Sequence, residues 1–299
     1  MKLFYASFLP LGPFHSKENK HNSMADFQPP LNAECGSEKE TQEEAHGAAK
    51  PSSPLAPDYE AHSSLKEGVS TGPSNDQLFF KACEEGDLNA VRTMVERRTQ
   101  EELLAGRGSK LNDTPLHCAA LAGHLPVAQY LCEQGADKEA RDYADETPLH
   151  SAAEGGHLHV MQYLCEQGAD KEVQGDGGTP LHLATTYGHL SMVQYLCQQG
   201  ADKEAKGDSG RTALHWAASE GHLPVAQYLC EQGADKEARD EDNWTPLHRA
   251  AGNDQLSVVQ YLCEQGADRQ AADEDGETPL SLARENEHTS VAQYLEECV

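Results

Sequence analysis

The chain has 299 residues, 37% of them hydrophobic, which is little for one large core but enough for a series of thin layers. Its 50 acidic residues outnumber its 23 basic residues, and this net charge of −27, most of it in residues 76–299, argues against nucleic acid or an anionic membrane as the main partner because phosphate groups are repelled. No apolar run approaches the roughly 18 residues that a membrane-spanning helix needs.

Residues 1–75 form the first segment, which is rich in Pro, Ser, Glu and Gly and shows little periodicity. Such a composition cannot bury enough apolar surface to offset the entropy of ordering, so we expect a disordered, low-complexity segment. Its opening, MKLFYASFLPLGPF, faintly resembles a signal peptide, but Pro10 and Pro13 interrupt the apolar stretch and no small-residue cleavage site follows. An alternative is that translation begins at Met24.

The cysteines and the glycosylation sequons indicate in which cellular compartment the protein is found. Five of the nine cysteines occupy one repeat position, which is not the spacing of a disulfide framework. Two Asn-x-Thr sequons, at 112–114 and 243–245, fall where the repeat must pack tightly, so glycans would be difficult to place there. Both observations favour reducing conditions. We therefore expect a cytoplasmic protein, with the nucleus as the alternative.

From residue 76 onward the sequence repeats at a nearly constant interval. The glycine of QGAD keeps this interval, and TPLH or a close variant begins at Thr114, Thr147, Thr179, Thr212, Thr245 and Thr278. A fixed period in this range indicates a solenoid, in which each unit buries its apolar face against its neighbours. The pattern TPLHxAAxxGHLxxVxxLxxxGAD resembles that of the ankyrin repeat family, and the resemblance covers residues 76–299.

This resemblance implies an all-α fold, an ankyrin-type α-solenoid of helix-turn-helix repeats joined by β-hairpin loops. We expect an N-terminal cap at 76–110 and a C-terminal cap at 275–299, where Arg284 and several glutamates replace small or apolar groups. The five full repeats between the caps are expected at about 111–143, 144–175, 176–208, 209–241 and 242–274.

Each repeat carries its own helix signals. Thr is a favourable N-cap residue, and the Pro that follows it is tolerated at the first helical position. We expect a left-handed glycine to end each first helix (Gly123, Gly156, Gly188 and Gly221), and Gly135 to end the second helix of its repeat. The interval between Thr147 and Thr179 is one residue shorter than the others. We place this deletion in the hairpin loop at 171–178, where length changes are tolerated.

The histidines and cysteines that recur at one position of each repeat do not predict a catalytic site or a metal site. In the family, the TPLH histidine links the Thr hydroxyl to neighbouring backbone, which implies a structural role for His117, His150, His182, His215 and His248. Each has the same small neighbours, with no nucleophile or pocket. The ladder of Cys132, Cys165, Cys197, Cys230 and Cys263 would spread ligands along a line, whereas zinc needs them around a point. We expect no catalytic residue, no metal and no cofactor.

The family often carries asparagine in a GADxN motif, where hydroxylation can modify it. This chain departs from that pattern with Glu139, Glu172, Glu204, Glu237 and Gln270. Regulation by asparagine hydroxylation is therefore not implied.

Partners of this family usually dock on the concave face, which consists of the hairpin tips and the exposed edge of each first helix. Specificity must lie where the repeats differ. The expected binding residues are Arg141, Tyr143, Glu146, Glu154, Asp176, Tyr187, Asp208, Arg211, Glu220, Arg239, Glu241, Asp242, Trp244, Asn253 and Asp275. Tyr143, Tyr187 and Trp244 are the expected anchors, unless they lie on an adjacent hairpin. Alanine at Trp244 and Tyr187 is expected to weaken binding without lowering the melting temperature.

We interpret the chain as a non-enzymatic adaptor or scaffold, a monomer that binds a protein partner on its concave face. Because the tips and edges are mostly Asp and Glu, the partner is expected to present a basic surface. Two alternatives stay open. One is a regulatory or enzyme-associated subunit whose activity a partner supplies, and the other is a passive product of repeat duplication without a strong partner.

Overall fold

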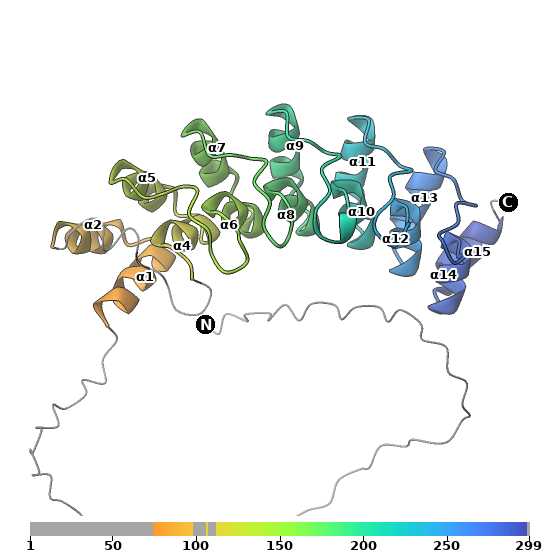
Figure 1. The fold of residues 1–299 in the computed structure, drawn as a ribbon, viewed down its shortest axis with the longest axis horizontal. Coiled ribbons are helices and arrows are strands. Elements are labelled where there is room, and N and C mark those ends of the chain that lie inside the picture. Colours follow the sequence, from red (N-terminus) through yellow and green to blue (C-terminus); the bar gives the residue numbers. More distant parts are fainter. Residues whose placement is uncertain (1–73, 98–105, 107–111, 298–299) are drawn as a thin grey trace, which may run out of the picture. The chain divides into compact units, whose positions relative to one another are not determined.

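A computed structural model describes residues 74–97, 106 and 112–297, and within them it contains fourteen α-helices arranged in seven pairs (Figure 1). The first helices of the pairs are α1 (Asn75–Glu85), α4 (Pro115–Leu121), α6 (Pro148–Gly155), α8 (Pro180–Thr186), α10 (Ala213–Ser219), α12 (Pro246–Gly252) and α14 (Pro279–Glu285). The second helices are α2 (Leu88–Glu96), α5 (Leu125–Glu133), α7 (Leu158–Glu166), α9 (Leu190–Gln198), α11 (Leu223–Glu231), α13 (Leu256–Glu264) and α15 (Thr289–Glu297). The predictions for the segment before Ser74 lie outside the described residues.

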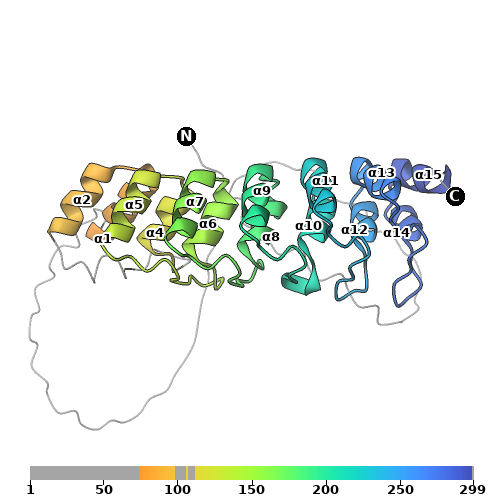
Figure 2. The ribbon, with the colours of Figure 1, turned by 90° about the horizontal axis from the view of Figure 1, so that it is seen from above.

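The pairs stack in single file. Each first helix packs on the first helix of the next pair, and each second helix packs on the next second helix. Figure 2 shows the loops that join successive pairs projecting to the same side of the stack. The predicted all-α solenoid is confirmed, and its loops form one continuous edge.

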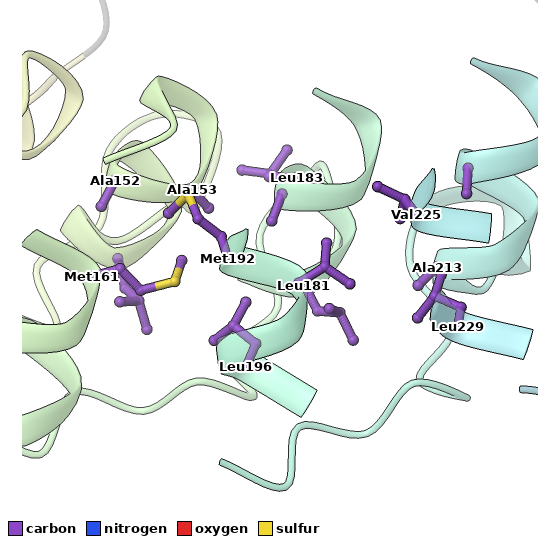
Figure 3. Close-up of a cluster of buried hydrophobic side chains, with 14 of the residues drawn as sticks. Ala152, Ala153, Met161, Leu181, Leu183, Met192, Leu196, Ala213, Val225 and Leu229 are labelled. Atoms are coloured by element: carbon purple, nitrogen blue, oxygen red, sulfur yellow. The ribbon is translucent and has the colours of Figure 1, made fainter. Parts of the chain in front are cut away.

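The core runs along the stack and has no single centre. Figure 3 shows Met161 of α7, Leu181 of α8 and Met192 of α9 packed together, with Val225 and Leu229 of the next pair beyond them. All five side chains are 0–1% exposed. Because a single pair cannot cover such side chains, each pair depends on its neighbours for stability.

The loops between pairs turn back on themselves without forming strands in the described part of the chain. In the loop before α12, the backbone N–H of Asp240 donates to the carbonyl of Trp244, and the Asp240 Oδ1 atom accepts from the N–H groups of Asp242 and Trp244. The loop before α8 is one residue shorter and closes with a single bridge between Gly175 and Gly178. The deletion predicted from the repeat period therefore lies in a loop, as expected.

Left-handed glycines end the first helices, and they also make room for the next pair. Gly188 has a φ of 72°, and a Cβ atom there would lie 2.7 Å from the ring of His222. His222 belongs to the next pair, and its ring reaches back to α8, where Nε2 donates to the carbonyl of Thr186. At the equivalent turn after α12, Asp254 adopts a φ of 58°, with its carboxylate 4.0 Å from His288.

Gly188→Ala is expected to lower the free energy of unfolding by about 2–4 kcal/mol, because the left-handed backbone costs roughly 1–2 kcal/mol and the clash with His222 adds overpacking strain. Gly168→Ala is the matched control. Gly168 also has a positive φ of 81°, but nothing lies within 4 Å of a Cβ there, so only the backbone cost of roughly 1–2 kcal/mol should appear. Urea unfolding measures both, and equal losses would contradict the close approach of His222.

The glutamates that replace the asparagine of the family motif link neighbouring repeats. The Glu139 carboxylate accepts the backbone N–H of Asp170 at 3.0 Å, and Glu204 accepts the N–H of Asp235 at 3.0 Å. Glu172 and Glu237 make the same bond to the following repeat. Where the sequence departs from the family pattern, these glutamates form one inter-repeat bond at each of four successive steps.

Candidate protein-binding surface

The TPLH histidines are buried linkers. The N–H of Thr147 lies 3.1 Å from His150 Nδ1, and His150 Nε2 lies 3.0 Å from the carbonyl of Gly178 in the next loop. Because a carbonyl only accepts, Nε2 carries the proton and Nδ1 accepts. Burial lowers the pKa of His150 to about 4, so the ring stays neutral. The same contacts recur at His117, His182, His215 and His248, which confirms the predicted structural role.

The cysteine ladder lies among tyrosines of the second helices. Cys132 is a half-buried free thiol that hydrogen-bonds the side chain of Tyr163, and burial raises the pKa of the thiol. Cys165 and Tyr195 repeat this arrangement one step along. Within the described residues, no group of three or more His, Cys, Asp and Glu side chains is placed to hold a metal ion.

The basic side chains of the loops are used to tie the loops together. Arg141 Nη1 donates to the carbonyl of Gln174 at 2.8 Å, one repeat ahead. Lys206 donates to the carbonyl of Arg239 at 3.0 Å, and Arg239 in turn donates to the carbonyl of Ala272 at 2.8 Å. We call this series of contacts the loop ladder. These bonds to neutral carbonyls fix the positions of the three cations and leave their charges in place, and Arg141 and Lys206 are exposed.

Acidic side chains occupy most of the outermost loop positions. The exposed residues there are Tyr143, Asp176, Asp208, Glu241 and Glu274. The predicted residues Asp242 and Asp275 are also exposed, next to the last two of these. The loop edge therefore presents one aromatic ring followed by a row of carboxylates.

Trp244 lies against the next loop. Its Nε1 atom donates to Asp273 Oδ2 at 2.8 Å, and the Arg249 guanidinium lies 4.3 Å from its ring centre. The predicted residue Arg211 stacks in the same way on Trp216, at 4.7 Å. Because of these contacts, we expect Trp244→Ala to lower the melting temperature, contrary to the expectation from the sequence. Whether Trp244 also binds a partner stays a prediction.

Arg249 is a residue that the sequence analysis missed. Its side chain is only 7% exposed, and Nε donates to Asp240 Oδ2 at 2.7 Å while Nη2 donates to Asp242 at 2.6 Å. The segments RTALHW (211–216) and WTPLHR (244–249) carry the Arg–Trp pair in opposite order, a signal that is readable in the sequence.

Arg249→Ala is expected to lower the free energy of unfolding by about 3–5 kcal/mol, because it leaves Asp240, whose side chain is 0% exposed, without its charge partner. The matched control is Arg284→Ala. Arg284 pairs with Glu296, but these side chains are 59% and 47% exposed, so the loss should stay below about 1 kcal/mol. Denaturant titration of both variants checks the difference, and similar losses would contradict the buried pair.

The edges of the first helices carry the remaining predicted residues. Tyr187 is half-buried, and its hydroxyl donates to Glu154 at 3.1 Å. Glu220 and Asn253 are exposed at the ends of α10 and α12, and Asn253 donates to the hydroxyl of Ser219 at 3.1 Å. All fifteen predicted residues thus lie on the loops before the first helices or at the C-terminal ends of the first helices.

Glu146 is held between two loops. Its pKa is raised to about 8, mainly by burial and also by the nearby carboxylates of Asp142, Glu154 and Asp176, while a hydrogen bond from the backbone of Gly177 opposes them. The loop residue Glu146 and the helix-edge residue Glu154 are therefore close enough to interact.

A family model described as "Ankyrin repeats (3 copies)" matches the chain at residues 57–142, 79–175, 141–207, 173–240 and 233–298. The chain belongs to the ankyrin repeat family. A crystal structure of the human ASB11 ankyrin repeat domain is similar to this ankyrin chain, with 26% identity and a TM-score of 0.66. The likeness covers 74% of this chain and 97% of the ASB11 domain. Ankyrin repeats are generally protein–protein interaction modules and are typically non-enzymatic.

Proposed function

We propose that this ankyrin stack is an adaptor that binds a basic protein surface on the face formed by its loops and first-helix edges. The observation that carries the proposal is the loop ladder. Arg141, Lys206 and Arg239 each donate to a carbonyl of a neighbouring loop, whereas Asp176, Asp208 and Glu241 are exposed and, with Asp242, Glu274 and Asp275, outnumber these cations. Such a surface attracts cationic partners over a distance and selects against anionic ones.

Two further observations support this function. The five TPLH histidines, whose side chains are of the type best suited to general acid–base catalysis, hold loops together. No helix in the described part of the chain has both the length and the apolar character to cross a membrane. We infer a monomeric, cytoplasmic protein whose action consists of bringing other proteins together.

The test begins with the full chain as bait, followed by purification of each captured protein and measurement of its Kd. Asp176→Lys combined with Asp208→Lys is expected to weaken binding roughly tenfold, because two outward charges are reversed. The matched control is Glu166→Lys combined with Glu231→Lys, which makes the same charge change on exposed positions of second helices. We expect less than a twofold effect from the control and a Kd that rises with salt.

Other results would favour the alternatives. Turnover by a captured complex would indicate a regulatory subunit whose partner supplies the activity. Equal effects of the loop variant and the control variant would place the binding surface elsewhere. If no captured protein bound saturably, the chain would be a passive product of repeat duplication.

A further inference from the structure

Exposed apolar side chains gather near the N-terminal end of the described stack. Among the described residues, the large hydrophobic side chains classed as exposed are Leu78 at 37%, Leu121 at 39% and Tyr143 at 74%. They belong to α1, α4 and the loop before α6. The apolar contacts that a partner needs are therefore available in the first three pairs.

The aromatic side chains farther along the stack are covered. Arg211 lies over Trp216, and Trp244 is bonded to Asp273 and covered by Arg249. A partner would have to displace these contacts to reach either indole ring. Tyr143 has no comparable cover.

The loop that follows the Tyr143 loop is short and rich in glycine. The N–H of Asp176 donates to the carbonyl of Ala144 at 2.8 Å, so the two loops are tied together next to Tyr143. The second loop is the short one, and Gly175, Gly177 and Gly178 give it few side chains. Tyr143, which is 74% exposed, therefore belongs to a loop whose next neighbour carries few side chains.

Carboxylates gather around Glu146, between this loop, the next loop and the end of α6. Asp142, Glu154 and Asp176 all interact electrostatically with Glu146. The end of α6 lies directly against the end of α4, since a Cβ atom on Gly155 would collide with the carbonyl of Leu121. We call the group of Leu121, Tyr143, Glu146, Glu154 and Asp176 the Tyr143 surface. It combines exposed apolar side chains with an excess of negative charge.

The cation next to the Tyr143 surface is already engaged. Arg141 donates to the carbonyls of Asp145 and Gln174 and lies 2.9 Å from the Asp145 carboxylate. Arg141 is therefore held in place by three acceptors, and a cation of a partner can add a direct contact to Glu154 and Asp176. An apolar side chain beside that charge would cover Tyr143.

We propose that the Tyr143 surface binds an extended basic segment of another protein. One apolar side chain of the segment, such as Leu or Phe, packs on Tyr143 and a second packs on Leu121, and a Lys or Arg side chain lies near Glu154 and Asp176. Charge complementarity selects the cation, and the exposed ring selects the apolar neighbour. This inference rests on the proposed function and assigns its main contacts to the N-terminal part of the stack.

The experiment selects a displayed library of random twelve-residue peptides against the full chain and then measures the Kd of enriched synthetic peptides. Tyr143→Ala is expected to weaken their binding roughly tenfold, as for a central aromatic contact. Glu154→Gln is expected to weaken it about fivefold, since the charge is lost while the amide oxygen can still accept from Tyr187. Enriched peptides should carry Lys or Arg near Leu, Phe or Tyr.

The last loop and last pair supply matched controls. Glu274 occupies the repeat position of Tyr143, and Glu285 occupies that of Glu154. Glu274→Ala and Glu285→Gln should change the Kd less than twofold. Basic peptides that ignore the Tyr143 and Glu154 changes would overturn this inference and leave the proposed function standing. Failure to enrich basic peptides would also overturn this inference, whereas the proposed function fails only if no captured protein binds in the test described above.

Discussion

A chain in which Asp142 is joined directly to Glu241 is expected to fold into a shorter stack of four helix pairs. Residues 123–142 and 221–240 are identical, so the deletion of 143–240 gives α12 the same preceding second helix and loop as before. Asp142 takes the place of Asp240 beside Arg249, and Arg141 takes the place of Arg239 in the loop ladder. Each retained pair therefore keeps nearly all of its contacts.

The deletion should nevertheless reduce stability strongly, because in a solenoid the free energy is approximately a sum over repeats and their interfaces. At 0.05–0.15 kcal/mol per residue, the loss is roughly 5–15 kcal/mol. The denaturant m-value should fall by about 40%, since it scales with the surface exposed on unfolding. Urea titration followed by circular dichroism measures both quantities.

An out-of-phase deletion is the control for this prediction. Removal of 143–223 joins Asp142 to Pro224, so one second helix would follow another with no first helix between them. We expect this variant to lose cooperative unfolding and expose apolar surface. If the in-phase variant behaved in the same way, contacts beyond nearest neighbours would have to hold the stack together.

Lowering the pH from 7 to 4 is expected to destabilise the stack by several kcal/mol. Burial lowers the pKa of His150 and of His215 from 6.5 to about 4, so the unfolded chain binds more protons than the folded chain in this range. Their contribution is fully present above pH 6.5 and is lost as the pH falls through 4. Each accounts for roughly 3 kcal/mol. Burial lowers the pKa of His182 and His248 as well. Urea unfolding at a series of pH values checks the slope.

Glu146 opposes this trend. Burial raises its pKa from 4.5 to about 8, so its contribution to stability is fully present below pH 4.5 and is lost as the pH rises through 8. Glu146→Gln should therefore stabilise the protein at pH 8 by on the order of 2 kcal/mol and have little effect at pH 4. Between pH 8 and pH 4, the free energy of unfolding should therefore fall more steeply in the variant than in the original protein.

Glu277→Gln is the control for Glu146→Gln. It makes the same change at the same position of the last described loop, where no further loop follows. A stabilisation at pH 8 that is equal in the two variants would mean that the neighbouring loop does not bury the Glu146 carboxylate.

The repeated letters were sufficient to predict the scaffold. Thr147 and Pro148 start α6, Gly156 ends it in a left-handed conformation, and His150 bridges to the next repeat. These features depend on bonds within one repeat or on contacts that every interface shares. A single repeat therefore contains the information for the whole stack.

The binding surface was less predictable, because it depends on where a side chain meets the next loop. The sequence placed Arg141, Arg239 and Trp244 at loop tips, but it could not show that all three reach across to the following repeat. The burial of Glu146 has the same origin, since it requires the position of the glycine-rich loop. A pair such as Arg249 and Trp244 can be recognised in the sequence only once the structure shows that the two side chains stack.

The loop ladder also affects how rapidly and how favourably a ligand can engage. Arg141 fastens the loop that follows it, and Lys206 and Arg239 do the same farther along. Ordering of flexible segments is a large part of the free-energy cost of association. Because these loops are already held in place in the free protein, they lose little conformational entropy when a ligand binds.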